Sequence, residues 1–322
     1  MKPLVTRLTR RFDLTHSIIQ APMAFAAGGR LAAAVARAGG LGLIGGAYGD
    51  QDWIARQFEA AGNQPVGCGF ITWAMDDDAD TLRQVLDRQP KAVFLSFGDP
   101  MPFSGLIRDA GVPLIVQVQT LDHARRAVEC GADVVVAQGA EAGGHGRSRA
   151  TMTLVPEVAD MLASRSPDTL LCAAGGIADG RGLAAALMLG ADGVVVGSRF
   201  WASHEADVHD AMLAAAIAAD GDATIRSSVM DIARRLNWPD AYTARVLKND
   251  FTDRWHDDLD GLLQLQDEEA ERWREAWQEG DTRTANTFVG EATGLIRSVE
   301  SAKDILESMS RQAQDCLSHS YD

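Results

Sequence analysis

The stretch Val134-Val-Val-Ala-Gln-Gly-Ala-Glu-Ala-Gly-Gly-His-Gly-Arg147 begins as an apolar, β-branched run and breaks into a glycine-rich loop at Gly139. An apolar run without alternation predicts a strand covered on both faces, as in a parallel sheet. In such sheets, ligands bind at the loops that leave the carboxyl ends of the strands. Gly144 and its neighbouring glycines leave room for a flat ligand to approach beside His145. The alternative is a surface loop whose histidine has no function.

Runs of the same kind recur along the first 205 residues and alternate with helical segments. Eight strands are expected, at 17–23, 41–45, 65–71, 92–97, 113–118, 133–138, 170–174 and 193–197. This alternation predicts an α/β fold, a (β/α)8 TIM barrel. A doubly wound open sheet is the alternative, because strand order cannot be read from a sequence.

The sequence changes in character after Phe200. Residues 206–284 contain helical patterns and no convincing strand, so we expect a helical insert, a second small α domain. Trp273 and Trp277 are four residues apart on one expected helix and predict a packing stripe. The expected organisation is a barrel domain over 1–205, the insert over 206–284, and C-terminal helices over 285–322 that return to cover the barrel.

Composition limits the classes of function. The chain has 322 residues, 46% hydrophobic and 23% charged, which is ordinary for a globular enzyme. A formal net charge of −15 argues against nucleic-acid or anionic-membrane partners. No run of 18 apolar residues occurs, and the four scattered cysteines are expected to be free thiols. We therefore expect a cytoplasmic protein, and its tryptophan-bearing helices leave a homodimer open.

Two glycine turns follow the last two expected strands, Ala173-Ala-Gly-Gly-Ile-Ala-Asp-Gly180 and Val196-Gly-Ser-Arg-Phe200. In many barrels, the turns at these two positions bind a phosphate through backbone N–H groups. The pair therefore predicts a phosphorylated cofactor, with ordinary tight turns as the alternative.

Metal and hydrolytic sites are not indicated. Glu141 precedes His145 by four residues, but both lie in a glycine loop rather than on a helix face, and the other histidines are scattered. No GxSxG sequence is present, and Cys68 lies within an expected strand, where a core thiol is the simpler interpretation.

Flavin mononucleotide (FMN) fits this set of features. Its phosphate would occupy the glycine turns, and its ring would lie across the barrel mouth against the turn Ala21-Pro22-Met23. Gln117 and Gln138 offer amide hydrogen bonds to the polar edge of the ring. His145 would then be the acid or base at neutral pH.

Five motifs resemble the nitronate monooxygenase family, formerly called 2-nitropropane dioxygenases. They are Gln20-Ala-Pro-Met23, Ala38-Gly-Gly-Leu-Gly42, Ala137-Gln-Gly-Ala-Glu-Ala-Gly-Gly-His145, Ala173-Ala-Gly-Gly-Ile177 and Val196-Gly-Ser-Arg-Phe200. The resemblance spans residues 17–205 and extends weakly to 290–296. The related FMN-dependent enoyl-ACP reductases and quinone reductases are similar at the same places. At Gly69, many relatives have an asparagine beside the flavin.

The resemblance implies an FMN-dependent oxidation of alkyl nitronates by dioxygen to a carbonyl compound and nitrite. His145 is then the catalytic residue, as a base toward a neutral nitroalkane or as the group that orients the nitronate. The resemblance implies cofactor contacts at Ala21, Pro22, Met23, Gln117, Gly175, Gly176, Gly197 and Ser198. The residues themselves add Gln138 and Gly144 as expected cofactor contacts and indicate no metal. The alternative is an NAD(P)H-dependent FMN reductase of enoyl thioesters or quinones on the same scaffold.

Overall fold

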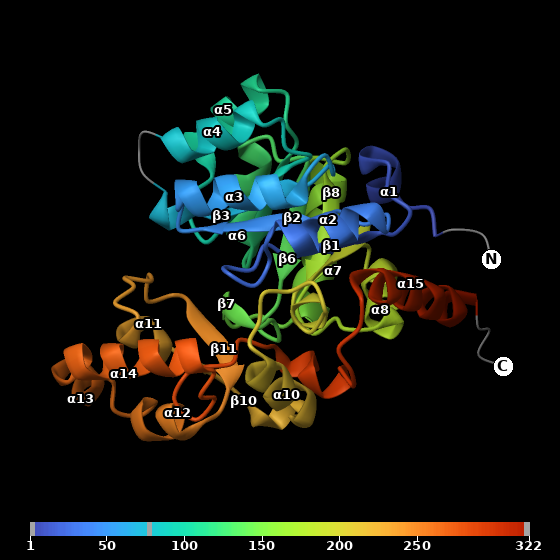
Figure 1. The fold of residues 1–322 in the computed structure, drawn as a ribbon. Helices are drawn as coiled ribbons and strands as arrows, with labels where there is room; N and C mark the ends of the chain where they lie inside the picture. The colour runs from blue at the N-terminus through green and yellow to red at the C-terminus, as the bar shows by residue number, and fades with distance from the viewer. Residues whose placement is uncertain (1–3, 76–78, 319–322) are drawn as a thin grey trace.

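A computed structural model describes residues 4–75 and 79–318 and contains one eight-stranded parallel sheet (Figure 1). Its strands are β1 (Ile18–Gln20), β2 (Leu43–Ala47), β3 (Gly67–Ile71), β4 (Val93–Ser96), β5 (Leu114–Val118), β6 (Val134–Gln138), β8 (Leu170–Ala174) and β9 (Gly193–Val196). They follow in the order β1-β9-β8-β6-β5-β4-β3-β2. The predicted eight strands are all present.

The two ends of this sheet meet, so the sheet is a nearly closed barrel. A parallel bridge joins Ile19 to Leu41, and the Leu41 N–H donates to the carbonyl of Ile18 at 3.1 Å. The buried side chain of Gln20 accepts the N–H of Leu43 at 3.0 Å across the same seam. This closure confirms the TIM barrel and excludes the doubly wound open sheet.

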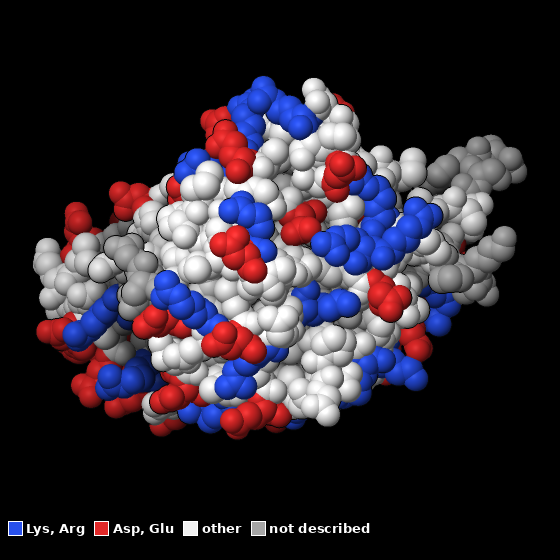
Figure 2. Space-filling model, turned by 90° about the horizontal axis from the view of Figure 1, so that it is seen from above, with Lys and Arg blue, Asp and Glu red and all other residues white. Residues whose placement is uncertain are grey.

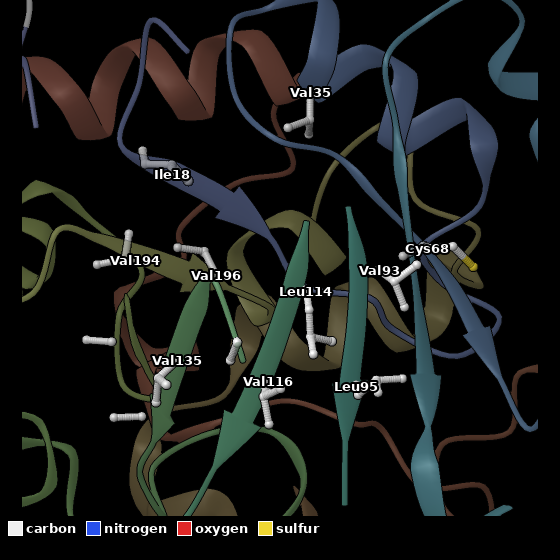
Figure 3. Packing of buried hydrophobic residues seen from close by; sticks show 14 of the residues in the cluster. Ile18, Val35, Cys68, Val93, Leu95, Leu114, Val116, Val135, Val194 and Val196 are labelled. Carbon is white, nitrogen blue, oxygen red and sulfur yellow. The ribbon is translucent and has the colours of Figure 1, made fainter. Parts of the chain in front are cut away.

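Alternation along each strand divides the apolar core into two layers. Val134 and Val136 of β6 face the barrel interior, where they pack with Ile115 and Cys172. Val135 belongs to the outer layer, which lies between strands and helices and is drawn in Figure 3 with residues such as Ile18, Val93 and Val194. Both faces are apolar, which explains the unalternating sequence pattern.

Helices cover the outside of the barrel. They are α2 (Gly29–Arg37), α3 (Gln51–Ala61), α4 (Asp80–Asp87), α5 (Met101–Asp109), α6 (Leu121–Glu129), α7 (Thr151–Arg165) and α8 (Gly180–Met188). Side chains cap several of them: Asp50 accepts the Trp53 N–H at 2.9 Å, and Thr120 accepts the His123 N–H at 3.1 Å. The C-terminal helix α15 (Ala302–Ser318) lies beside α8 and α2 and completes the outer ring (Figure 1).

The sequence did not predict the short helix α1 (Arg7–Phe12), which packs against residues of the barrel interior. Leu8 and Phe12 are buried with the interior residues Ile19 and Leu43. Thr6 and Thr9 form a capping box that begins α1.

The segment after the barrel strands is mainly helical, as expected, but it also contains two strands that we did not predict. Its helices are α9 (Ser198–Trp201), α10 (Asp210–Ala218), α11 (Val229–Ala233), α12 (Asp250–Trp255), α13 (Leu259–Gln264) and α14 (Gln266–Glu279). Strands β10 (Thr224–Ser227) and β11 (Thr243–Leu247) pair with β7 (Gly144–Gly146) in a second sheet, ordered β10-β11-β7. This sheet joins the segment to the barrel (Figure 1). The domain boundaries at 205 and 284 stay predictions.

Charges of both signs are interspersed over the face shown in Figure 2. Many exposed charges elsewhere in the chain form ion pairs, such as Arg126 with Asp99 at 2.8 Å. Such exposed pairs contribute little to stability individually. Within the described residues, no helix has the length and apolar character required to cross a membrane.

Candidate functional site

A cavity of about 610 Å³ opens at the carboxyl ends of the barrel strands. This is within the range of about 300–1,000 Å³ that is usual for small-molecule and cofactor sites. All the predicted site residues line it: Ala21, Pro22, Met23, Gln117, Gln138, Gly144, His145, Gly175, Gly176, Gly197 and Ser198. The structure therefore brings the predicted residues together, while their individual roles stay predictions.

His145 lies in β7, which the second sheet holds in place. His145 pairs with Ala244 of β11 in an antiparallel register. Arg226 donates to the carbonyls of Gly146 at 2.6 Å and Ala140 at 3.2 Å, and Arg245 donates to the Ala140 carbonyl at 3.0 Å. The glycine loop of the barrel is thus fixed by two arginines of the segment after the barrel.

The imidazole of His145 is buried and contacts a buried carboxylate. Its Nε2 lies 3.0 and 2.9 Å from the two oxygens of Asp231, a residue of α11. Burial lowers the pKa of His145 below its usual 6.5, and the bond to Asp231 partly offsets this shift. The ring is therefore neutral near pH 7, as a general base must be.

An aromatic cluster surrounds the imidazole. The indole of Trp238 stacks on it with ring centres 3.4 Å apart and planes 4° from parallel. Trp238 Nε1 donates to the hydroxyl of Tyr48 at 3.1 Å, and Phe97 and Tyr242 meet the indole edge-on. This wall keeps the ring in one orientation and excludes water from one of its faces.

The two glycine turns lie side by side because β8 and β9 are paired neighbours. Gly175 and Gly176 have φ angles of +100° and +75°, which side chains rarely tolerate. A Cβ on Gly197 would meet nothing closer than 3.8 Å, so this turn is open toward the cavity. Among the described residues, no backbone hydrogen bond uses the N–H of Gly175, Gly176, Gly197 or Ser198. These N–H groups remain available to an anion.

The turn after β1 approaches its neighbours closely. A Cβ on Gly45 would collide with the carbonyl of Met23, and a Cβ on Gly69 would collide with the ring of Pro22. Gly69 therefore lines the cavity without a side chain, and the asparagine that many relatives have there would not fit unless Pro22 moved.

The two glutamines of the cavity differ in what they can offer a ligand. Gln138 Nε2 donates to the His145 carbonyl at 3.2 Å, and its Oε1 accepts from Gln117 at 3.1 Å and from Gln119 at 2.9 Å. Both ends of Gln138 are thus engaged within the protein. Gln117 keeps its carbonyl oxygen, which has no hydrogen-bond partner among the described residues.

The structure adds cavity residues that the sequence did not reveal, among them Tyr48, Arg234 and Trp238. It also adds Asp231, whose buried carboxylate contacts His145 behind the cavity lining. Asp231 interrupts the apolar run Val229-Met-Asp-Ile-Ala233, and an acidic residue within such a run is a signal of a buried, paired carboxylate. Trp273 and Trp277 stack with ring centres 5.2 Å apart, as a packing stripe should, and they also line the cavity.

Glu141 and the cysteines, the other residues considered for metal or hydrolytic chemistry, are part of the fold's own contacts. Glu141 accepts the N–H and the hydroxyl of Thr151, at 3.0 and 2.9 Å, at the start of α7. No cluster of three metal-ligating side chains occurs among residues 4–75 and 79–318. All four cysteines are free thiols, and burial raises the pKa of Cys68 to about 12, which suits a core thiol.

Comparison with known proteins shows which of them share this sequence and fold. A family model described as nitronate monooxygenase matches residues 5–68 and 63–312. The nitronate monooxygenase npaC of Metarhizium robertsii is 36% identical over 93% of this chain and 91% of its own.

Solved structures agree with this match. FabK from Thermotoga maritima has a TM-score of 0.83 and 32% identity, over 98% of this chain and 97% of its own. A nitroalkane oxidase from Streptomyces ansochromogenes has a TM-score of 0.80 and 25% identity, over 96% of this chain and all of its own. The chain therefore belongs to the nitronate monooxygenase family and is an oxidoreductase.

Proposed function

We propose that this protein binds FMN and uses dioxygen to oxidise alkyl nitronates to a carbonyl compound and nitrite. The observation that carries the proposal is the single cavity lined by His145, both glycine turns and the turn at Pro22. Its family membership supports nitronate oxidation in general terms.

The residues present fit FMN. The neighbouring turns at Gly176 and Gly197 offer unpaired N–H groups to a phosphate. The space beside Gly197 is open, and a Cβ on Gly176 would lie 3.3 Å from the Cβ of Glu141, so glycine suits both positions. Gly144 has no heavy atom within 4 Å of the place where a Cβ would be, so a flat ring can pass. Bound FMN would supply the electron acceptor for the oxidation.

The chain's own groups would handle the substrate. His145 would take a proton from the carbon beside the nitro group, or orient a substrate that arrives as a nitronate. The guanidinium of Arg234 lies 5.8–5.9 Å from the centres of three cavity rings, those of Tyr48, Trp273 and Phe288. A cation in a mainly apolar and aromatic cavity suits an anionic nitronate.

Aerobic turnover of propionate 3-nitronate tests the proposal. The purified, FMN-loaded protein should consume oxygen and release nitrite without added NADPH, and protein stripped of FMN should do neither. A loaded protein that produces no nitrite would contradict the proposal.

NAD(P)H-dependent reduction of an enoyl thioester or quinone is the second candidate, because the same motifs resemble FMN-dependent enoyl-ACP and quinone reductases. Anaerobic bleaching of the flavin by NADPH at a useful rate would favour it. Absence of bleaching, together with nitrite release from the nitronate, would favour the oxidation.

A further inference from the structure

The buried carboxylate of Asp231 has one polar partner that explains its position. Its side chain is 3% exposed, and both of its oxygens lie within 3.0 Å of His145 Nε2. Burying a carboxylate is costly unless it is paired. An ionised carboxylate only accepts hydrogen bonds, so the ring nitrogen that faces it carries a proton.

This arrangement selects one tautomer of His145. Burial keeps the imidazole neutral near pH 7, and the positive charges of Arg234 and Arg226 act in the same direction. A neutral imidazole carries one ring proton, and here that proton lies on Nε2. Nδ1 is therefore the nitrogen with a free lone pair, and no described residue forms a hydrogen bond with it.

The ring has little freedom to turn over. Trp238 stacks on its face, and the backbone on both sides of His145 is fixed by pairing with β11. Asp231 belongs to α11 and His145 to β7, so the two halves of the pair come from different parts of the chain, 86 residues apart.

We propose that Asp231 is a positioning residue that holds His145 as its Nε2–H tautomer, so that Nδ1 is the atom that accepts the substrate proton. This rests on the proposed function. The C–H bond beside the nitro group breaks, its proton goes to Nδ1, and its electron pair forms the C=N bond of the nitronate, whose negative charge rests on the nitro oxygens. The carboxylate then stabilises the resulting imidazolium.

The variant Asp231→Asn tests the assignment. An amide can donate to Nε2 and thereby favour the opposite tautomer, with the proton on Nδ1. We expect kcat/KM for a neutral nitroalkane to fall about 10²–10⁴-fold, while turnover of a preformed nitronate, which needs no proton removal, falls far less. Asp231→Glu should restore part of the nitroalkane activity. Equal losses on both substrates, or no loss, would overturn the proposal.

One further readout and one control variant distinguish a positioning role of Asp231 from a general effect on folding. The acidic limb of the pH profile of kcat/KM should move to lower pH in Asp231→Asn, because the carboxylate raises the pKa of His145. The control Asp267→Asn removes an exposed carboxylate of α14 that pairs with Arg235, and both activities should stay at the wild-type level.

A spectroscopic measurement needs no turnover and no variant. The ¹⁵N resonances of His145 in the wild-type protein should show a protonated Nε2 and an unprotonated Nδ1 at pH 7. A proton on Nδ1 would overturn the proposal even if the enzyme oxidises nitronates. If the enzyme turns over no nitroalkane or nitronate, the proposed function fails, and the resonances still decide the tautomer.

Discussion

At the scale of single residues, we propose separable roles for His145 and the glycine turns, because His145 lies in β7 and the turns follow β8 and β9. His145→Asn should keep FMN bound and lose about 10²–10⁴-fold in rate on neutral nitroalkanes, since proton removal then lacks its base. Flavin absorbance and nitrite release measure the two effects. A variant with full activity on neutral nitroalkanes would rule out His145 as the base.

Gly176→Asp should lower FMN occupancy, because a carboxylate would face the phosphate. The control for backbone strain is Gly131→Asp, whose φ of +76° equals the +75° of Gly176 to within one degree. Nothing lies within 4 Å of a Cβ on Gly131, whereas a Cβ on Gly176 would lie 3.3 Å from the Cβ of Glu141. The control carries the same backbone strain outside the cavity and should retain flavin. Equal loss from both variants would show that strain, not charge, is responsible.

How far the sequence predicts the site depends on how local each signal is. His145 and the turns at Gly176 and Gly197 lie within short motifs, so they could be recognised. Asp231 lies 86 residues from His145, and nothing local relates the two. Gln138 stays predicted as a ligand contact: it lines the cavity, and its amide also forms hydrogen bonds with Gln117, Gln119 and the His145 carbonyl.

At the scale of elements, α15 is the helix that closes the outer layer of the barrel. Gly180 permits its close approach, because a Cβ there would collide with Gln312. Met309→Ala should destabilise the protein by about 2–5 kcal/mol, since this side chain is only 2% exposed against the barrel helices. Denaturant unfolding measures this loss.

The control is Met188→Ala, which removes a methionine that is 78% exposed. Its cost should stay within about 0.5 kcal/mol. Similar losses from the two variants would contradict the docking of α15 as a stabilising contact.

The strands of the second sheet were not predicted, because they form through tertiary pairing rather than through a local sequence signal. β7 is Gly-His-Gly and has little intrinsic strand preference, and it becomes a strand only by pairing with β11. β10 reads Thr-Ile-Arg-Ser, too short and too polar to stand out among helices. The barrel strands were predictable because their apolar runs are covered on both sides.

At the scale of the whole molecule, burial lowers the pKa values of His16, His123 and His145 below 6.5. The unfolded chain therefore binds more protons than the folded chain just below this pH, so the free energy of unfolding should fall as pH falls from about 6.5. Melting temperatures between pH 7.5 and 5.5 measure this.

A double variant, His16→Gln with His123→Gln, should flatten that pH dependence, because it removes two of the imidazoles whose pKa values burial lowers. A melting temperature that rises on acidification would contradict the assignment of neutral buried imidazoles.

The central claim is that the turns after β8 and β9 hold the phosphate of a flavin whose ring lies beside His145. Equilibrium titration of the flavin-free protein with FMN and with riboflavin, which lacks the phosphate, tests it most directly. Hydrogen bonds from N–H groups to a charged phosphate contribute about 1.5–3 kcal/mol each, so FMN should bind at least about tenfold more tightly than riboflavin. Equal affinities, or no binding of either flavin, would contradict the account.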